Sequence, residues 1–144
     1  MKFTIGPSEK ERLELVVHGY SCDEYDNEYD ANWLHAVVSI SSGAFKGSVT
    51  LNVMATELAV FTKQTSALFE NLSGEAELTT LEDQLKIKLC GDGIGHICVS
   101  GYVRDQVGIG FNTLQYELAI DQTQLKSSIE ELIKLLDEYP ERKV

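Results

Sequence analysis

Residues 33–74 read WLHAVVSISSGAFKGSVTLNVMATELAVFTKQTSALFENLSG, and the spacing of their apolar residues changes near residue 56. Up to residue 53, apolar and polar residues alternate on both sides of a Ser-Ser-Gly turn, which is typical of a β-hairpin. From Thr56 onward, apolar residues recur every three or four positions, which predicts an amphipathic helix over about residues 56–73. Thr56 is its expected N-cap, and Gly74 suits the left-handed conformation just beyond its end. The stretch therefore predicts two antiparallel strands that lead directly into a helix.

The flanking sequence has the same order of strands followed by a helix. Period-two alternation predicts earlier strands near residues 3–5 and 11–17, and later strands near residues 76–78, 85–89, 97–103 and 114–120. A closing helix is expected over about residues 122–138, capped by Asp121 together with Gln124. Its predicted buried stripe is Leu125, Ile129, Leu132, Ile133 and Leu136.

These elements predict an α+β fold. Short connections favour antiparallel pairing of neighbouring strands, so we expect a mostly antiparallel sheet of about seven or eight strands. Two amphipathic helices are expected to cover one face of the sheet system. The order of the elements also hints at a repeated strands–helix unit, although the two halves share little sequence similarity.

The composition is that of one globular domain over residues 1–144. The chain has 144 residues, of which 43% are hydrophobic, and only two prolines, so it can bury a core with little disorder beyond its first few and last few residues. Its 23 acidic residues outnumber its 12 basic residues, which gives a formal net charge of -11. This charge disfavours binding to nucleic acid or anionic membranes and favours a basic partner or a cation, unless it serves only solubility.

The cysteines indicate neither a metal site nor a disulfide framework. Cys22, Cys90 and Cys98 have spacings that fit no metal-ligand pair. Cys90 and Cys98 are expected to be buried, reduced thiols that can face each other across a hairpin. The chain also shows no apolar signal-peptide core and no run of about 18 apolar residues, so we expect a cytoplasmic location.

The histidines and glycines indicate no catalytic centre. His18, His35 and His96 lie in or beside predicted strands, and none has a second histidine or cysteine at ligand spacing on a shared motif. His96 shares a strand face with Cys98, but a structural role is favoured for it. The glycine-rich segment 91–95 does not precede a helix, so it is interpreted as a hairpin turn rather than a phosphate-binding loop. We therefore expect no enzymatic activity, no cofactor and no metal site.

An acidic segment that contains tyrosines interrupts the strand pattern at residues 21–32. Its spacing is not that of an EF-hand loop, because the required glycine is absent. Carboxylates supply an electric field and tyrosines supply amphipathic contact area, which together suit a basic protein partner; a solvated surface loop is the alternative. The candidate partner-binding residues of this segment are Asp23, Glu24, Tyr25, Asp26, Glu28, Tyr29 and Asp30.

Trp33 is the remaining candidate for partner binding. If Leu34 and its alternating neighbours face the core, then Trp33, His35 and Val37 face the opposite way. An uncovered sheet face with a tryptophan is a candidate binding hot spot. Burial of Trp33 beneath other strands is the favoured alternative, because tryptophan is usually mostly buried.

Four groups of residues follow one another through nearly the whole chain: WLHAVVSI (33–40) with GAFKG (43–47), LFENLSGEA (68–76), GHICVSG (95–101) and LQYELAIDQ (114–122). Together they resemble the WapI family of bacterial immunity proteins. The resemblance implies a cytosolic protein of similar size. It also implies a partner, the nuclease C-terminal domain of a secreted, wall-associated toxin, which the immunity protein neutralises. It assigns no binding residues.

The net charge is compatible with this implied function. Nuclease domains are commonly basic where they hold phosphate, so an acidic inhibitor can be steered to that surface and can compete with the nucleic acid. The alternative function is a small-ligand or metal-binding regulatory module, which a closed pocket lined by His96, Cys98 and Tyr102 would favour.

Overall fold

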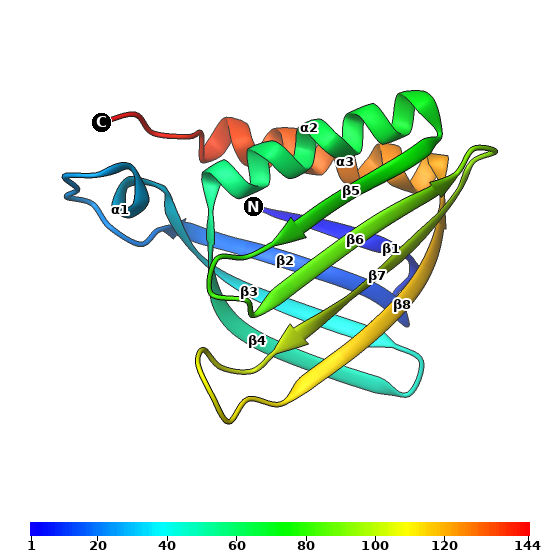
Figure 1. Ribbon diagram of the computed structural model, residues 1–144, viewed down its shortest axis with the longest axis horizontal. Helices are drawn as coiled ribbons and strands as arrows, with labels where there is room; N and C mark the ends of the chain where they lie inside the picture. Colours follow the sequence, from blue (N-terminus) through cyan, green and yellow to red (C-terminus); the bar gives the residue numbers. More distant parts are fainter.

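The computed structural model describes residues 1–144 as eight strands and three helices (Figure 1). The first antiparallel sheet contains β1 (Lys2–Ser8), β2 (Glu11–Tyr20), β3 (Trp33–Ser42) and β4 (Phe45–Met54), in that order. The second contains β5 (Ser73–Thr79), β6 (Leu85–Asp92), β7 (His96–Arg104) and β8 (Thr113–Asp121), also in chain order. The helices are α1 (Glu28–Asn32), α2 (Ala55–Asn71) and α3 (Gln122–Glu138). The predicted α+β class, antiparallel pairing and two long helices are confirmed.

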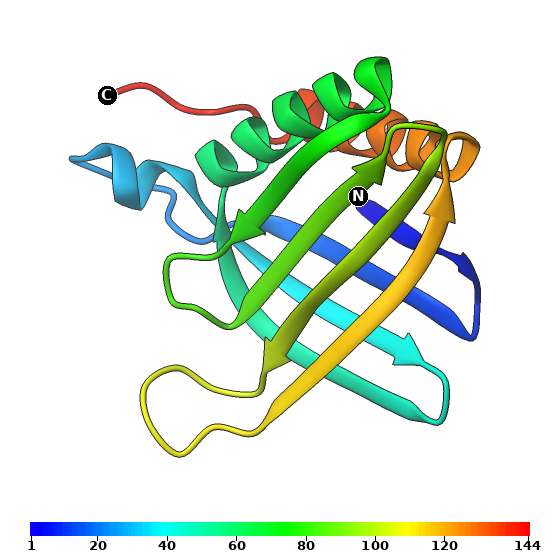
Figure 2. The ribbon, with the colours of Figure 1, turned by 45° about the vertical axis from the view of Figure 1, so that its right-hand side comes forward.

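The two sheets face each other across one hydrophobic core. A cluster of 30 buried residues includes side chains from all eight strands and from α2 and α3. Figures 1 and 2 show the two sheets crossing, with α2 and α3 beside each other along one side of the pair. These helices pack mainly against β5 and β1, the first strand of each sheet. The helices therefore lie on one side of the sheet system, but they pack along the edge strands β1 and β5, because each sheet buries its inner face against the other sheet.

The long helices satisfy backbone groups of the edge strands β1 and β5. From α3, Ser128 Oγ donates a hydrogen bond to Thr4 O at 2.6 Å, and Glu131 accepts one from Thr4 N at 3.1 Å. From α2, Gln64 accepts a hydrogen bond from Glu77 N in β5 at 3.0 Å. An edge strand otherwise presents unpaired N–H and C=O groups that invite pairing with another chain. The helices thereby protect one edge of each sheet.

The ends of α2 differ from the predicted ones. The helix begins at Ala55, with Met54 rather than Thr56 as its N-cap, and the Glu57 carboxylate accepts a hydrogen bond from Met54 N at 2.9 Å. At the other end, Leu72 is the left-handed residue that ends the helix, with φ at 59°, and Gly74, two positions further on, also has a positive φ of 107°. The predicted cap of α3, by contrast, is confirmed.

The buried stripe of α3 differs from the predicted one at its C-terminal half. Leu125, Ile129 and Leu132 are buried as predicted, but Leu135 is fully buried while Ile133 is 47% exposed. The helix packs along β1 and α2, and a helix with neighbours on one side buries a stripe and leaves the opposite side in solvent. The sequence is apolar at both positions, so only the packing distinguishes them.

Candidate protein-binding surface

The acidic loop (residues 21–32) joins β2 to β3 and projects from one end of the molecule (Figures 1 and 2). Its second half forms the short helix α1, which the sequence pattern does not predict. Asn27 caps α1, since its side chain accepts a hydrogen bond from Asp30 N at 2.9 Å. Ala31 and Asn32 are buried at the end of α1. The loop is therefore a folded projection that is anchored where it enters β3.

The acidic loop carries five carboxylates that face solvent. None of them forms an ion pair with a lysine or an arginine. Carboxylates without neutralising partners in one short segment produce a concentrated negative potential, which attracts positively charged surfaces. The five exposed residues are Asp23, Glu24, Asp26, Glu28 and Asp30.

The C-terminal residues hold the acidic loop in place through Asn32. Its Nδ2 donates hydrogen bonds to Glu28 O at 2.8 Å and to Arg142 O at 3.0 Å, and its Oδ1 accepts one from Arg142 N at 2.8 Å. The residue is only 1% exposed, and a buried amide without partners costs about 1–3 kcal/mol. Asn32 thus meets its own hydrogen-bonding needs by fixing the tail to the loop.

Arg142 makes a second set of contacts with the loop. Its Cζ lies 3.3 Å from the ring centre of Tyr20 and 5.2 Å from that of Tyr25, and its Nη1 donates to Cys22 O at 3.2 Å. A guanidinium group over an aromatic face is attracted by the negative face of the ring. The Tyr20 hydroxyl also donates to Pro140 O. The tail therefore contacts both ends of the loop, and Arg142 is the cation that contacts the tyrosine rings.

Sequence patterns do not indicate this arrangement. Asn32 and Arg142 are 110 positions apart, and Cys22 and Arg142 are 120 positions apart. The periodicity of a strand or a helix reports only neighbours within a few residues. The one available signal is an arginine that follows the helix-ending Tyr139-Pro140 pair.

The aromatic candidates have different environments in the structure. Tyr25 is half-buried against Arg142, whereas Tyr29 on α1 is 62% exposed. Trp33 follows α1 directly, lies opposite Met54 of β4 and is half-buried. The favoured interpretation of Trp33 as a core residue is therefore wrong: His35, two positions on, is exposed on the same outer face of the sheet.

A shallow hollow joins the acidic loop to this outer face. Its volume is about 390 Å³, and its lining includes His18 and His35, whose ring centres are 6.1 Å apart. Ser21, which begins the acidic loop, also lines the hollow and donates a backbone hydrogen bond to Trp33 O at 2.8 Å. None of the candidate residues lines the hollow itself. We use the name acidic-loop surface for the candidate residues of the acidic loop and the start of β3: Asp23, Glu24, Tyr25, Asp26, Glu28, Tyr29, Asp30 and Trp33.

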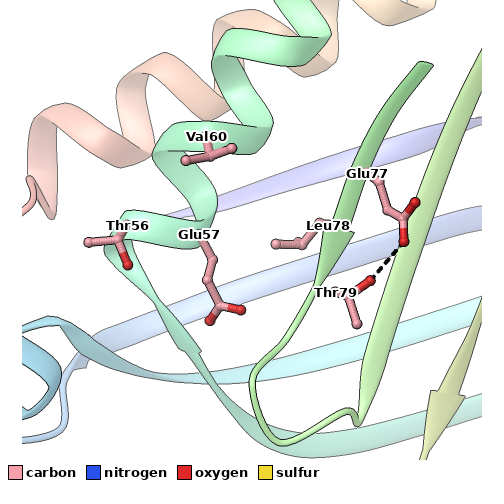
Figure 3. Close-up of a pocket in the computed structure, with 6 residues that line it drawn as sticks. All are labelled: Thr56, Glu57, Val60, Glu77, Leu78 and Thr79. Atoms are coloured by element: carbon pink, nitrogen blue, oxygen red, sulfur yellow. Dashed lines mark hydrogen bonds between the residues drawn. The ribbon is translucent and has the colours of Figure 1, made fainter.

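A separate pocket of about 280 Å³ lies between the start of α2 and the end of β5 (Figure 3). Burial raises the pKa of Glu57 at its edge, and hydrogen bonds from backbone N–H groups oppose the rise. Glu77, across the pocket, accepts a hydrogen bond from the Thr79 hydroxyl at 3.1 Å. The pocket is lined by two carboxylates, two threonines and two apolar residues, and no histidine, cysteine or lysine lines it.

The residues expected to line an alternative ligand pocket do not enclose one. His96 and Cys98 are exposed on β7, and His96 Nδ1 lies 2.9 Å from Asp92 Oδ2. The Tyr102 hydroxyl donates to Asp83. No group of three or more histidine, cysteine, aspartate or glutamate side chains has an arrangement that could hold a metal ion. None of the helices is long and apolar enough to span a membrane.

The prediction that Cys90 and Cys98 are buried is wrong. Leu89 and Val99 face the core, and successive side chains of a strand point to opposite faces, so both cysteines point outward. Both are free and exposed. They are directly opposite each other in the β6–β7 pair, which confirms that they face each other across a hairpin.

A protein-family match covers nearly the entire chain. No curated protein and no solved structure matches it. Residues 4–140 match the model of a family described as "Immunity protein WapI-like family", and this span includes both sheets, the acidic loop and the long helices. The chain therefore belongs to the WapI-like family of immunity proteins.

Proposed function

We propose that this protein acts in the cytoplasm as a non-enzymatic inhibitor that binds and neutralises the nuclease domain of a secreted, wall-associated toxin. We further propose that the acidic-loop surface makes the contact. Family membership supports a toxin as the partner, because immunity proteins are typically inhibitors without catalytic activity of their own. The observation that carries the proposal for this surface is the group of five exposed carboxylates without cationic partners.

The chemistry of the acidic-loop surface fits a basic, phosphate-binding protein. The carboxylates offer charges opposite to those that hold nucleic acid in a nuclease, so they steer association and occupy the same positive groups. Tyr29 and Trp33 supply exposed and half-exposed aromatic area, which is the residue chemistry enriched at binding hot spots. Inhibition then follows from occlusion of the nucleic-acid site, and no bond in the inhibitor is made or broken.

The contacts of Asn32 and Arg142 support a pre-ordered binding loop. A loop that is already held in one conformation loses less conformational entropy on binding than a flexible one, and this difference strengthens affinity. The tail supplies that order without covering the carboxylates, all five of which are exposed. The fold of this end of the molecule is therefore consistent with a surface prepared for a partner.

The first experiment tests the function itself. The protein is mixed with the product of the neighbouring toxin gene, and complex formation and nuclease activity are measured at low salt. We expect a complex at micromolar concentration and loss of nuclease activity at equal stoichiometry. The proposal is wrong if no complex forms under these conditions or if the nuclease stays active within the complex.

A second experiment tests the acidic-loop surface. In one variant, Asp23, Glu24, Asp26, Glu28 and Asp30 are changed to their amides, and the association rate should fall by about tenfold or more at low salt. The matched control makes the same change of net charge at exposed acids without hydrogen-bond partners: Glu9, Glu70, Glu130, Asp137 and Glu138. An equal decrease in both variants would mean that overall charge, and not the loop, steers association.

A further inference from the structure

Cys90 and Cys98 form a cross-strand pair of thiols on the outer face of the second sheet. They are direct partners in the register of β6 with β7, which continues without a shift on both sides of them. Partners in an antiparallel pair have Cα atoms about 4.5 to 5.5 Å apart. Disulfides span Cα separations of about 4.4 to 6.8 Å. The backbone therefore already holds the two residues at a separation that a disulfide requires.

The outer face of the second sheet leaves both sulfur atoms open to reagents. Cys90 and Cys98 are exposed, and the long helices pack mainly against the edge strands β5 and β1 and not over this face. The third cysteine, Cys22, is half-buried in the acidic loop, where its carbonyl accepts a hydrogen bond from Arg142, and it belongs to another part of the molecule. The pair is thus accessible and separate from the acidic-loop surface.

We propose that Cys90 and Cys98 are a site of reversible thiol–disulfide exchange, at which a small disulfide such as glutathione disulfide converts the two thiols into a cross-strand disulfide. The inference does not depend on the toxin partner. Its basis is the direct pairing of the two residues, their exposure and their rigid hairpin.

The exchange takes place in two balanced steps. In the first, one cysteine thiolate attacks the small disulfide, which forms a mixed disulfide and releases one thiolate. In the second, the other cysteine thiolate attacks the protein-bound sulfur atom of the mixed disulfide and releases the second small thiolate. The protein loses two electrons and two protons, and the small disulfide becomes two thiols. Excess small thiol reverses both steps.

Two neighbouring carboxylates restrain the reaction. Cys90 Sγ donates to Glu75 at 3.8 Å, and Cys98 Sγ donates to Glu117 at 3.7 Å. Burial and the nearby Glu117 charge raise the pKa of the Cys98 thiol. Since only the thiolate attacks, we expect a slow reaction at neutral pH, with a rate that rises by about tenfold for each pH unit below the thiol pKa.

The test uses the full-length, reduced protein and glutathione disulfide. After acid quenching and alkylation of the remaining thiols, peptide mass spectrometry should find Cys90 linked to Cys98 with loss of two hydrogen atoms and Cys22 alkylated. The Cys98→Ser variant should instead accumulate Cys90 with bound glutathione, because it lacks the second thiol that completes the exchange. The proposal is overturned if the wild-type protein keeps both thiols, retains unresolved mixed disulfides or forms only disulfides between molecules.

The Glu117→Gln variant tests whether the rate of disulfide formation depends on ionisation of the Cys98 thiol and not only on the closeness of the two cysteines. Removing this charge lowers the pKa of the Cys98 thiol and so increases the fraction of thiolate. The intramolecular disulfide should therefore form at least about twofold faster at neutral pH. Glu75→Gln is the companion variant at the other thiol. An unchanged rate in both, together with no rise of the wild-type rate with pH, would show that the cross-link does not form by thiolate exchange on the native hairpin.

Discussion

At the scale of single residues, the buried amide of Asn32 joins two segments that are 110 positions apart in the sequence. An aspartate or a serine at this position would be as polar, but neither can donate two hydrogen bonds and accept one in the same geometry. The acidic residues around Asn32 give it no distinctive sequence context. Its role is defined only by the carbonyl and amide groups that surround it after folding.

We predict that Asn32→Ala lowers the free energy of unfolding by about 1–3 kcal/mol, because it removes three partly buried hydrogen bonds to backbone groups of Glu28 and Arg142. Amide hydrogen exchange should accelerate within the acidic loop. Asn71→Ala, at an exposed position at the end of α2, is the matched control and should alter neither measurement. Equal exchange of the loop in both variants would show that the tail does not order it.

The carboxylate of Glu57 caps the start of α2, but it is partly buried, and burial disfavours its charged form. It accepts a hydrogen bond from Met54 N, and burial raises its pKa above the ordinary value. A raised pKa means that the folded protein binds the proton more tightly than the unfolded chain does. This contribution to stability is present at low pH and is lost as the pH rises through the folded-state pKa.

We predict that Glu57→Gln removes this pH dependence and keeps the cap, because an amide oxygen can accept the same hydrogen bond. The free energy of unfolding of the variant, measured relative to that of the wild type, should therefore increase as the pH is raised from about 4 to about 7. Glu57→Ala should lose about 0.3–1.5 kcal/mol at both pH values, since it removes the cap. Chemical denaturation at the two pH values measures both effects, and parallel pH profiles for wild type and Glu57→Gln would contradict the prediction.

At the scale of the elements, α3 shows how packing selects among apolar residues. Leu132 and Leu135 are fully buried, but Ile133 is 47% exposed. The helical period predicts a stripe, but the sequence of α3 contains apolar residues beyond the width of that stripe. Contacts with β1 and α2 decide which of them enter the core.

We predict that Leu132→Ala destabilises the protein by about 2–5 kcal/mol, because it leaves a cavity between α3 and the sheets. Ile133→Ala, one position away on the same helix, should change stability by no more than about 0.5 kcal/mol. Urea denaturation of the two variants compares truncation to alanine at a buried position and at an exposed position of the same helix. A large effect of Ile133→Ala would instead place that side chain against a partner or a second copy.

At the scale of the whole molecule, the two sheets are expected to fold together. Each sheet has its inner face against the other, and one cluster of 30 residues spans both. Each half ends with a long helix, but α3 packs along β1 of the first sheet, and α2 packs along β5 of the second. Neither half therefore has a complete core of its own, and we propose that residues 1–144 form one cooperative domain.

We predict a single unfolding transition for the whole chain. The only tryptophan, Trp33, reports on the first sheet by fluorescence, and far-ultraviolet circular dichroism reports on all elements. The two thermal curves should coincide. Leu89→Ala, in the second sheet, should shift both curves downward together. Separate transitions, or a shift of the dichroism curve alone, would show that the sheets unfold independently.

The residues at the centre of the strands determine most of this fold without reference to tertiary contacts. Alternation from Leu34 to Val53 specifies a hairpin, and the change of period after it specifies α2, because side chains repeat every two positions in a strand and every 3.6 in a helix. Asp121 with Gln124 likewise specifies the start of α3, because a cap is made within one turn. The acidic character of residues 23–30 is also explicit in the sequence.

Only the tertiary structure decided what lies outside these local relations. Three features depend on which surfaces meet in the folded protein. They are the division of the strands into two sheets, the position of Trp33 on the outer face of β3, and the outward direction of Cys90 and Cys98. The order of the acidic loop depends on Arg142, which reaches it across 120 positions of sequence. The physical reason is the same in each case: local periodicity specifies the shape of an element, whereas burial and hydrogen bonding depend on partners that only folding brings together.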